Sequence, residues 1–201
     1  MTKQHSFLYL CSGILAGCFL PGVWTVTQAA TPLTSMSYSP DVTIELNTTL
    51  VEDQAVLEDN LLGVTALQNL GVLPANADVD AYHNLGDGEH LLSFDVTVNL
   101  GGLTVHPADV IRYDGSIYVL EFDASAAGVP QGANVDAVAF RTDNDLYLSF
   151  DTSVTLQTIV YHDEDIVSYD GANFNPVLKT AAEGISAQLD VDAIDRFPDA
   201  N

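Results

Sequence analysis

The sequence predicts an all-β fold made of tandem four-stranded antiparallel meanders, each unit 56 residues long. The triplet Val-Asp-Ala begins at residues 79, 135 and 191, in two equal steps of 56. The stretches that open with the first two triplets also agree at their ends, which read Leu-Ser-Phe-Asp at 92–95 and at 148–151. β-Branched and aromatic residues alternate with polar ones between these landmarks, a pattern typical of strands. Self-similarity at a fixed period indicates a repeat architecture.

Each unit is expected to contain four short strands joined by tight turns. Gly-Asp-Gly-Glu at 86–89 and Asp-Gly at 114–115 supply turn residues. The stretch 51–70 also spaces its leucines like a helix, but its alignment with the next unit favours strands, and a helix remains the alternative. In the clearest unit the expected strands are 79–85, 90–100, 109–113 and 117–123, followed by a small-residue segment at 124–134.

Residues 1–30 read as a signal peptide rather than as part of the fold. Lys3 precedes an apolar run from Phe7 to Trp24, and small residues follow at the end of the segment. A lipoprotein signal is the alternative, because Leu-Ala-Gly-Cys at 15–18 resembles a lipobox that would make Cys18 the lipidated residue. The only other cysteine, Cys11, lies in the same segment, so no disulfide is expected in the exported chain.

Residues 31–201 are expected to form one β-repeat domain. Its first unit lacks the opening Val-Asp-Ala strand, whereas the chain ends with such a strand that has no unit after it. A terminal strand that completes the first unit would remove an exposed sheet edge. The expected segments are units at about 31–78, 79–134 and 135–190, called units one, two and three below, and a closing strand at 191–197.

The chain is strongly acidic, with a formal net charge of −23. Such a surface repels nucleic acid and anionic lipid, so no nucleic-acid partner is expected, and a membrane contact is expected only through a lipid anchor at Cys18. Aspartate suits turns and hard-cation sites, because its short carboxylate reaches nearby amides or a metal ion. A solvated surface suited to a salty medium is the alternative use of these acids.

Asp80, Asp136 and Asp192 occupy the same position in the three Val-Asp-Ala segments. If these segments lie innermost, their carboxylates converge and must either take up protons or hold a cation, for which calcium is the expected ion. The alternative is that each carboxylate accepts hydrogen bonds from backbone amides. Further candidate cation ligands lie in the loop after the second strand and at the start of the third: Asp109, Asp163 and Asp165.

No catalytic residue is predicted. His106 and His162 each precede an aspartate by three residues, a pairing that could bind zinc or act as a base, although loop histidines on the surface are the simpler interpretation. No Gly-x-Ser-x-Gly motif accompanies them, and the acidic loops lack the Asp-x-Asp-x-Asp-Gly spacing of a calcium loop.

The unit formed by Val-Asp-Ala, Leu-Ser-Phe-Asp and the later Tyr-Asp-Gly at 113–115 and 169–171 resembles SMP-30/NHL-type β-propeller blades and acidic repeats of exported bacterial proteins. The resemblance implies a β-propeller-like arrangement, although 56 residues exceed the usual blade and three blades are few. A homodimer could complete a ring. A threefold β-trefoil or β-prism is the alternative fold.

The function expected from these features is that of an exported, non-catalytic β-domain. It would bind a protein or glycan partner at the cell envelope and be stiffened by calcium. Two alternatives remain open: a metal-dependent hydrolase of the lactonase type, which the resemblance implies, and an acidic structural protein adapted to high salt.

Overall fold

The computed structural model describes residues 35–40, 42–46, 48–75, 77–140, 145–186 and 189–194. All of them belong to one compact unit, Leu33–Asn201. The predicted signal peptide and Cys18 therefore lie outside the described residues. Within the described part, no helix combines the length and the apolar character needed to cross a bilayer.

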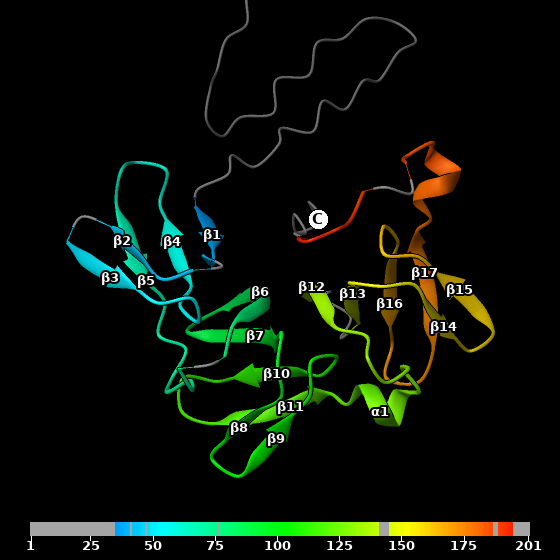
Figure 1. The fold of residues 1–201 in the computed structure, drawn as a ribbon, viewed down its shortest axis with the longest axis horizontal. Coiled ribbons are helices and arrows are strands. Elements are labelled where there is room, and N and C mark those ends of the chain that lie inside the picture. The colour runs from blue at the N-terminus through cyan, green and yellow to red at the C-terminus, as the bar shows by residue number, and fades with distance from the viewer. Residues whose placement is uncertain are drawn as a thin grey trace, which may run out of the picture. The chain divides into compact units, whose positions relative to one another are not determined.

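The described chain is nearly all β, as predicted (Figure 1). One short α-helix, α1 (Ala124–Ala127), and a 3-10 turn at Thr180–Glu183 are its helical elements. The strands, in chain order, are β1 (Met36–Tyr38), β2 (Ile44–Leu46), β3 (Thr49–Val51), β4 (Leu57–Asp59), β5 (Thr65–Leu67), β6 (Val79–Gly86), β7 (Glu89–Phe94), β8 (Val98–Leu100), β9 (Leu103–Val105), β10 (Val110–Tyr113), β11 (Tyr118–Phe122), β12 (Val135–Phe140), β13 (Leu146–Phe150), β14 (Val154–Leu156), β15 (Ile159–Tyr161), β16 (Ile166–Tyr169) and β17 (Phe174–Leu178).

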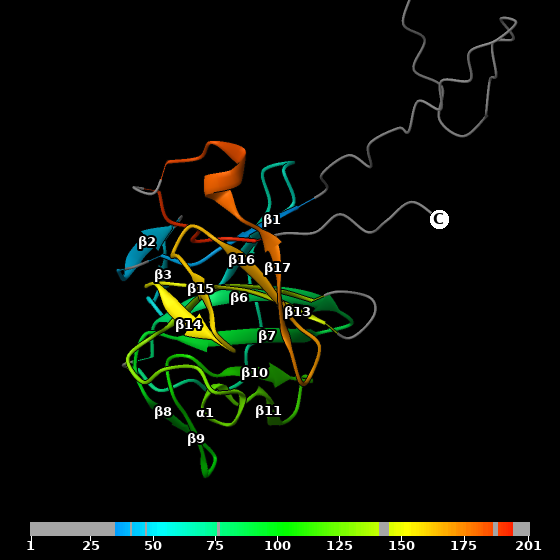
Figure 2. The same ribbon diagram turned by 90° about the vertical axis from the view of Figure 1, so that its right-hand side faces the viewer.

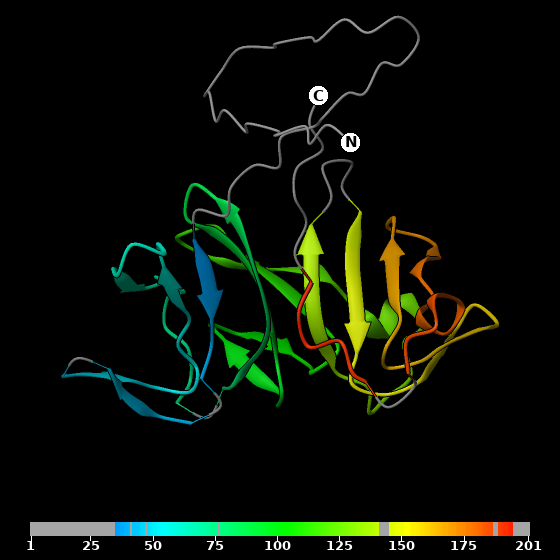
Figure 3. The ribbon, with the colours of Figure 1, turned by 90° about the horizontal axis from the view of Figure 1, so that it is seen from above.

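Two four-stranded antiparallel sheets have the same order of strands. In the first, β6, β7, β10 and β11 follow one another across the sheet (Figure 2). In the second, β12 pairs antiparallel with β13, and β16 and β17 complete the sheet (Figure 3). A three-stranded sheet, β1-β4-β5, precedes them, and three separate hairpins are formed by β2–β3, β8–β9 and β14–β15. None of these sheets closes on itself.

The hairpins are the main departure from the predicted meander. The single strand expected at 90–100 is two strands, because the chain bends after Phe94 and β8 leaves the sheet to pair with β9. At the bend, the Asp95 carboxylate accepts a hydrogen bond from the backbone N–H of Asp78 at 3.3 Å. The hairpin explains why each unit is 56 residues long although its sheet has only four strands.

The small-residue segment after β11 contains the helix α1, which the sequence pattern did not predict. Asp123 caps its first turn by accepting a hydrogen bond from the Ala126 N–H at 2.9 Å. Gly128 ends it with φ +86°, a left-handed conformation that glycine adopts without strain. Four residues give too little periodicity for a helix to be recognised from sequence.

Units two and three place corresponding residues at corresponding points of their ladders. Val79 pairs with Phe94, and Val135 pairs with Phe150. In both sheets the register then shifts immediately after the valine, which leaves Asp80 and Asp136 at a bulge. A bulge residue has no partner across the ladder, so its side chain can be aimed independently of the pleat.

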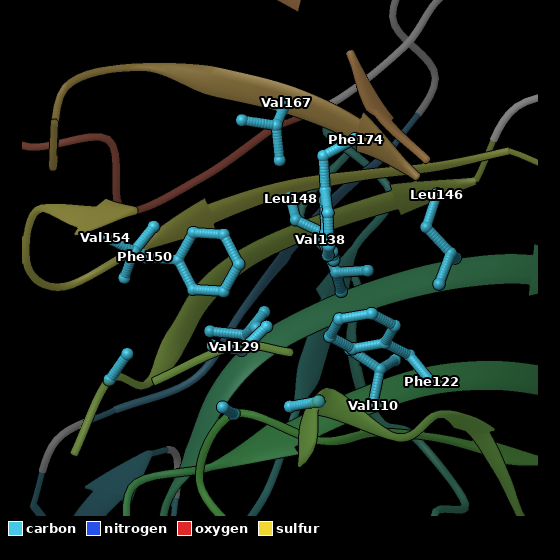
Figure 4. Close-up of a cluster of buried hydrophobic side chains, with 14 of the residues drawn as sticks. Val110, Phe122, Val129, Val138, Leu146, Leu148, Phe150, Val154, Val167 and Phe174 are labelled. Carbon is cyan, nitrogen blue, oxygen red and sulfur yellow. The ribbon is translucent and has the colours of Figure 1, made fainter. Parts of the chain in front are cut away.

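The apolar core consists of two clusters that join successive units. One lies between units one and two and contains Val56, Leu70, Leu92, Phe94 and Ile111. The other lies between units two and three, where Phe122 and Val129 face Leu148, Phe150 and Phe174 (Figure 4).

Phe94 and Phe150 fill the core as predicted, at 0% and 2% exposure. The neighbouring Ser93 is buried as well, and it links units two and three. Its hydroxyl accepts a hydrogen bond from the Ala81 N–H at 2.9 Å and donates one to the Val135 carbonyl oxygen at 2.5 Å.

Two further predictions concern the stretch 51–70 and the C-terminal segment. The stretch 51–70 forms β4 and β5 and no helix, as the repeat register indicated. The closing strand expected at 191–197 lies only partly within the described residues, and there Val191–Ile194 form no strand.

Candidate metal centre

A pocket of about 560 Å³ lies where the first strands of the three sheets and the C-terminal segment meet. Unit one contributes 37–39 around β1, unit two contributes residues of β6, and unit three contributes residues of β12. All three aspartates of the Val-Asp-Ala segments line it, so the structure brings Asp80, Asp136 and Asp192 to one cavity. Asp78 adds a fourth acidic residue to the lining.

Asp136 is the buried member of this group. The bulge in β12 directs it inward, and the residue is only 6% exposed. Neither carboxylate oxygen has a hydrogen-bond partner in the described part of the chain. A buried carboxylate without partners is energetically costly, so such a group either holds a proton or binds a cation.

Two residues of the C-terminal segment face Asp136. One carboxylate oxygen each from Asp136, Asp190 and Asp192 lie within 4.8 Å of one another. Asp190 and Asp192 are exposed, and Asp190 accepts a hydrogen bond from the Val191 N–H at 2.9 Å. Three converging carboxylates offer an oxygen-only ligand set of the kind that hard cations prefer.

The electrostatics of the pocket reflect this crowding. Burial, and then the charge of Asp190, raise the pKa of Asp136 to about 8. Burial also raises the pKa of half-buried Asp80 to about 6, with added repulsion from Asp95 and Asp151. The pKa of Asp190 is raised in the same sense, first by burial and then by the charge of Asp192. The cavity therefore repels negative charge and favours either protons or a cation.

Asp109, predicted as a further ligand, lies elsewhere and holds a loop together. It is 4% exposed. Its Oδ2 accepts a hydrogen bond from the His106 N–H at 2.9 Å, and its Oδ1 accepts one from the Ala124 N–H at 2.9 Å. The carboxylate thus ties the loop before β10 to the start of α1.

Asp165 holds the corresponding loop of unit three together, and it also pairs with Lys179. Its Oδ2 accepts hydrogen bonds from the His162 N–H at 3.0 Å and from Lys179 Nζ at 2.7 Å. Its Oδ1 accepts hydrogen bonds from the Thr180 N–H and hydroxyl. Burial alone would raise the pKa of Asp165, but Lys179 and the backbone donors lower it.

The remaining predicted residues do not join the cluster. Asp163 is half-buried and its charge contributes to the raised pKa of Asp190. His106 and His162 are exposed loop residues whose Nδ1 atoms lie 3.3 Å from Thr97 Oγ1 and 3.1 Å from Ser153 Oγ.

Sequence reasoning missed Asp190. It stands directly before the third Val-Asp-Ala triplet, as Asp78 stands before the first, but Asn134 stands before the second, so the position is not acidic in every copy. The pattern that could have identified Asp190 is its spacing from Asp192, two residues further along in a predicted inner segment. In an extended segment such residues point the same way.

Comparison with protein-family models, with curated proteins and with solved structures gave no match.

Proposed function

We propose that this chain is an exported, non-catalytic β-domain that binds partners at the cell surface and is stiffened by calcium. The observation that carries the proposal is the buried Asp136, which faces Asp190 and Asp192 and whose two oxygens lack partners among the residues that the structure describes. A cation between these carboxylates would satisfy Asp136 and remove the repulsion among the three charges.

Calcium fits the ligand set better than softer metals do. The described cluster offers carboxylate oxygens and no nitrogen or sulfur ligand. Calcium takes about six to eight oxygens in flexible geometry, so three carboxylates leave positions for water or for oxygens of a partner. Bound calcium would also fix Asp190 and Asp192 against β12 and thereby order the C-terminal segment.

The same pocket supports the finer architecture. β1, β6 and β12 are edge strands of their three sheets, and all contribute to its lining. Edge strands that converge on one cavity are what a β-propeller-like arrangement requires, and they favour it over a β-trefoil or β-prism. We therefore place the proposed cation beside the pseudo-symmetry axis of three repeated units.

The test is a calcium titration by calorimetry of the chain as the producing cell processes it. It is run in about 0.15 M monovalent salt, so that diffuse screening is already present. We expect one saturable site per chain in the wild type and none in Asp136→Asn. The matched control is Asp87→Asn, which removes the same charge from a turn where φ is +53°, a conformation that asparagine tolerates.

Proton release gives an independent readout of the same site. Since the pKa of Asp136 is about 8 without a cation, calcium must displace a proton from this group near pH 7. The binding heat should therefore depend on the ionisation enthalpy of the buffer. Titrations without saturable heat would remove the cation from the proposal, and folding that responds only to monovalent salt would favour the salt-adapted structural protein.

A metal-dependent hydrolase is the second candidate, favoured by the pocket beside the cluster, whose lining includes Asp80 as well as Asp136 and Asp192. Its test is hydrolysis of lactones and esters with calcium, manganese or zinc present. Activity that is lost in both Asp80→Asn and Asp136→Asn, but kept in Asp87→Asn, would establish this candidate in place of the first.

A further inference from the structure

Every unit has two apolar faces, which we define by the contacts of unit two. Its front face carries Leu92, Phe94 and Val98, which belong to the cluster shared with unit one. Its back face carries Phe122 and Val129, which belong to the cluster shared with unit three. The front face of unit three, with Leu148, Phe150 and Val154, packs against that back face (Figure 4). The front faces of units two and three thus each meet the back face of the preceding unit.

The front face of unit one has no such neighbour among the described residues. Met36 of β1 stands 56 residues before Leu92 of β7, and it is 51% exposed, whereas Leu92 is 0% exposed. The hairpins give a second comparison, because Ile44 pairs with Val51 as Val98 pairs with Val105. Val98 is 3% exposed, whereas Ile44 is only half-buried.

The back face of unit three is open in the same way. Ile185 and Leu189 stand 56 residues after Val129 and Ala133. The two residues of unit two are 8% and 5% exposed, because unit three covers them, whereas Ile185 and Leu189 are 40% and 55% exposed. Within the described residues, one front face and one back face therefore stay uncovered, and they are the two kinds of surface that pack together at both internal interfaces.

We propose that a second copy of this chain covers these faces, with the front face of unit one in each copy packing on the back face of unit three in the other. The contact continues an interface that the chain already makes twice within itself, so its shape and apolar character are built into the repeat. Two such contacts, related by a twofold axis, make a closed dimer. The inference does not depend on the proposed calcium site.

Charge sets the conditions under which the dimer forms. Each copy carries a formal net charge of −23, so two copies repel each other at low ionic strength. Salt screens this repulsion, with a Debye length of about 8 Å at physiological ionic strength, but leaves the apolar contact intact. We therefore expect association to strengthen when monovalent salt is raised from about 0.05 M to about 0.5 M.

The test is the molar mass of the cell-processed chain in solution, measured by sedimentation equilibrium. The wild type should have the mass of two chains. Met36→Asp and Ile185→Asp each place a charge in both contacts of the dimer and should give single chains. Both residues are exposed within one copy, at 51% and 40%, so neither change should lower the unfolding midpoint. The control is Ile117→Asp, a 57% exposed site in unit two outside both faces, and this variant should stay dimeric.

Mixing the two single-chain variants identifies which faces meet. A mixed dimer has one contact with both lesions and one contact between two unaltered faces, so the two-chain mass should reappear, with weaker association than in the wild type. A contact between two front faces would gain nothing from mixing. The proposal is overturned if the wild type stays a single chain at about 100 µM in either salt. A mixture that stays single-chain would also overturn it.

Discussion

Asp165 and Asp136 are both buried aspartates of unit three, at 2% and 6% exposure, yet their surroundings are opposite. Asp165 accepts hydrogen bonds from two backbone amides, a hydroxyl and Lys179, and its pKa is lowered. Asp136 has no hydrogen-bond partner among the described residues, and its pKa is raised to about 8. Both residues are almost fully covered from solvent, but only Asp165 has donors around it. One carboxylate therefore fastens a loop, and the other is left to bind a proton or a cation.

The largest change in stability is expected when Asp165, the hydrogen-bonded carboxylate, is replaced. Asp165→Ala leaves the buried N–H of Thr180 without an acceptor and frees Lys179, and it should lower the free energy of unfolding by about 3 kcal/mol. Urea unfolding at neutral pH measures the change. A loss below about 1 kcal/mol would mean that the loop is held by other contacts.

The next largest effect should be the stabilisation of the fold by calcium, which depends on Asp136 and not on Asp165. At a free calcium concentration of about 100 times the dissociation constant, the wild type should gain about 2.7 kcal/mol of stability. Asp136→Asn should gain almost nothing, whereas Asp165→Asn should keep the gain on a less stable background. Equal gains in stability for the wild type and for Asp136→Asn would show that calcium does not bind at Asp136.

Without calcium, the same substitutions should have opposite signs. In the presence of a chelator at pH 9, Asp136→Asn removes a buried charge that repels Asp190, and it should stabilise the fold by about 1 kcal/mol. Asp165→Asn should destabilise under the same conditions, since the amide cannot accept from Lys179 in the same way. Thermal unfolding of the two variants side by side gives the sign of each change.

The contributions of Asp136 and Asp165 to stability should change in opposite directions with pH. The folded-state pKa of Asp136 is raised, so its protonated form stabilises the fold, and this contribution is lost as the pH rises through about 8. Asp80 behaves in the same way, with loss as the pH rises through about 6. Asp165 has a lowered pKa, so its contribution is present above the unfolded value and is lost as the pH falls through the folded value.

In chelator, unfolding free energy should therefore fall as the pH rises from 6 to 9, and Asp136→Asn should flatten this part of the curve. A wild-type curve that is flat across this range would show that Asp136 is not isolated from solvent.

The sequence allowed the sheets and the convergence of three aspartates to be predicted, because both follow from the 56-residue period. A repeated Val-Asp-Ala segment at an inner strand places Asp80 and Asp136 alike, and the pocket contains both. The bulge that aims Asp136 inward was not predictable, since a register shift depends on the partner strand as well as on local sequence.

Asp190 and the role of Asp165 show where sequence reasoning stopped. Asp190 reaches the cluster only because the C-terminal segment returns to β12, a long-range contact without a local signal. Asp165 has the same residue type and the same period as the inner aspartates, but Lys179, fourteen residues away, supplies its cation from within the chain. Spacing gave the positions of these carboxylates, and only tertiary contacts gave their partners.

The β8–β9 and β14–β15 hairpins stand at the same point of two successive sheets, outside the ladders that join β7 to β10 and β13 to β16. Each is anchored by buried residues at its base and ends in an exposed turn, Gly101-Gly102 in one and Gln157-Thr158 in the other. Exposed turns of this kind tolerate insertions. The Gly101-Gly102 tip can therefore vary in length and sequence while the ladders stay intact, whereas the Gln157 side chain bonds the backbone of Ala172 and Phe174 at the start of β17. The β8–β9 hairpin is thus the natural grafting position for a new recognition loop.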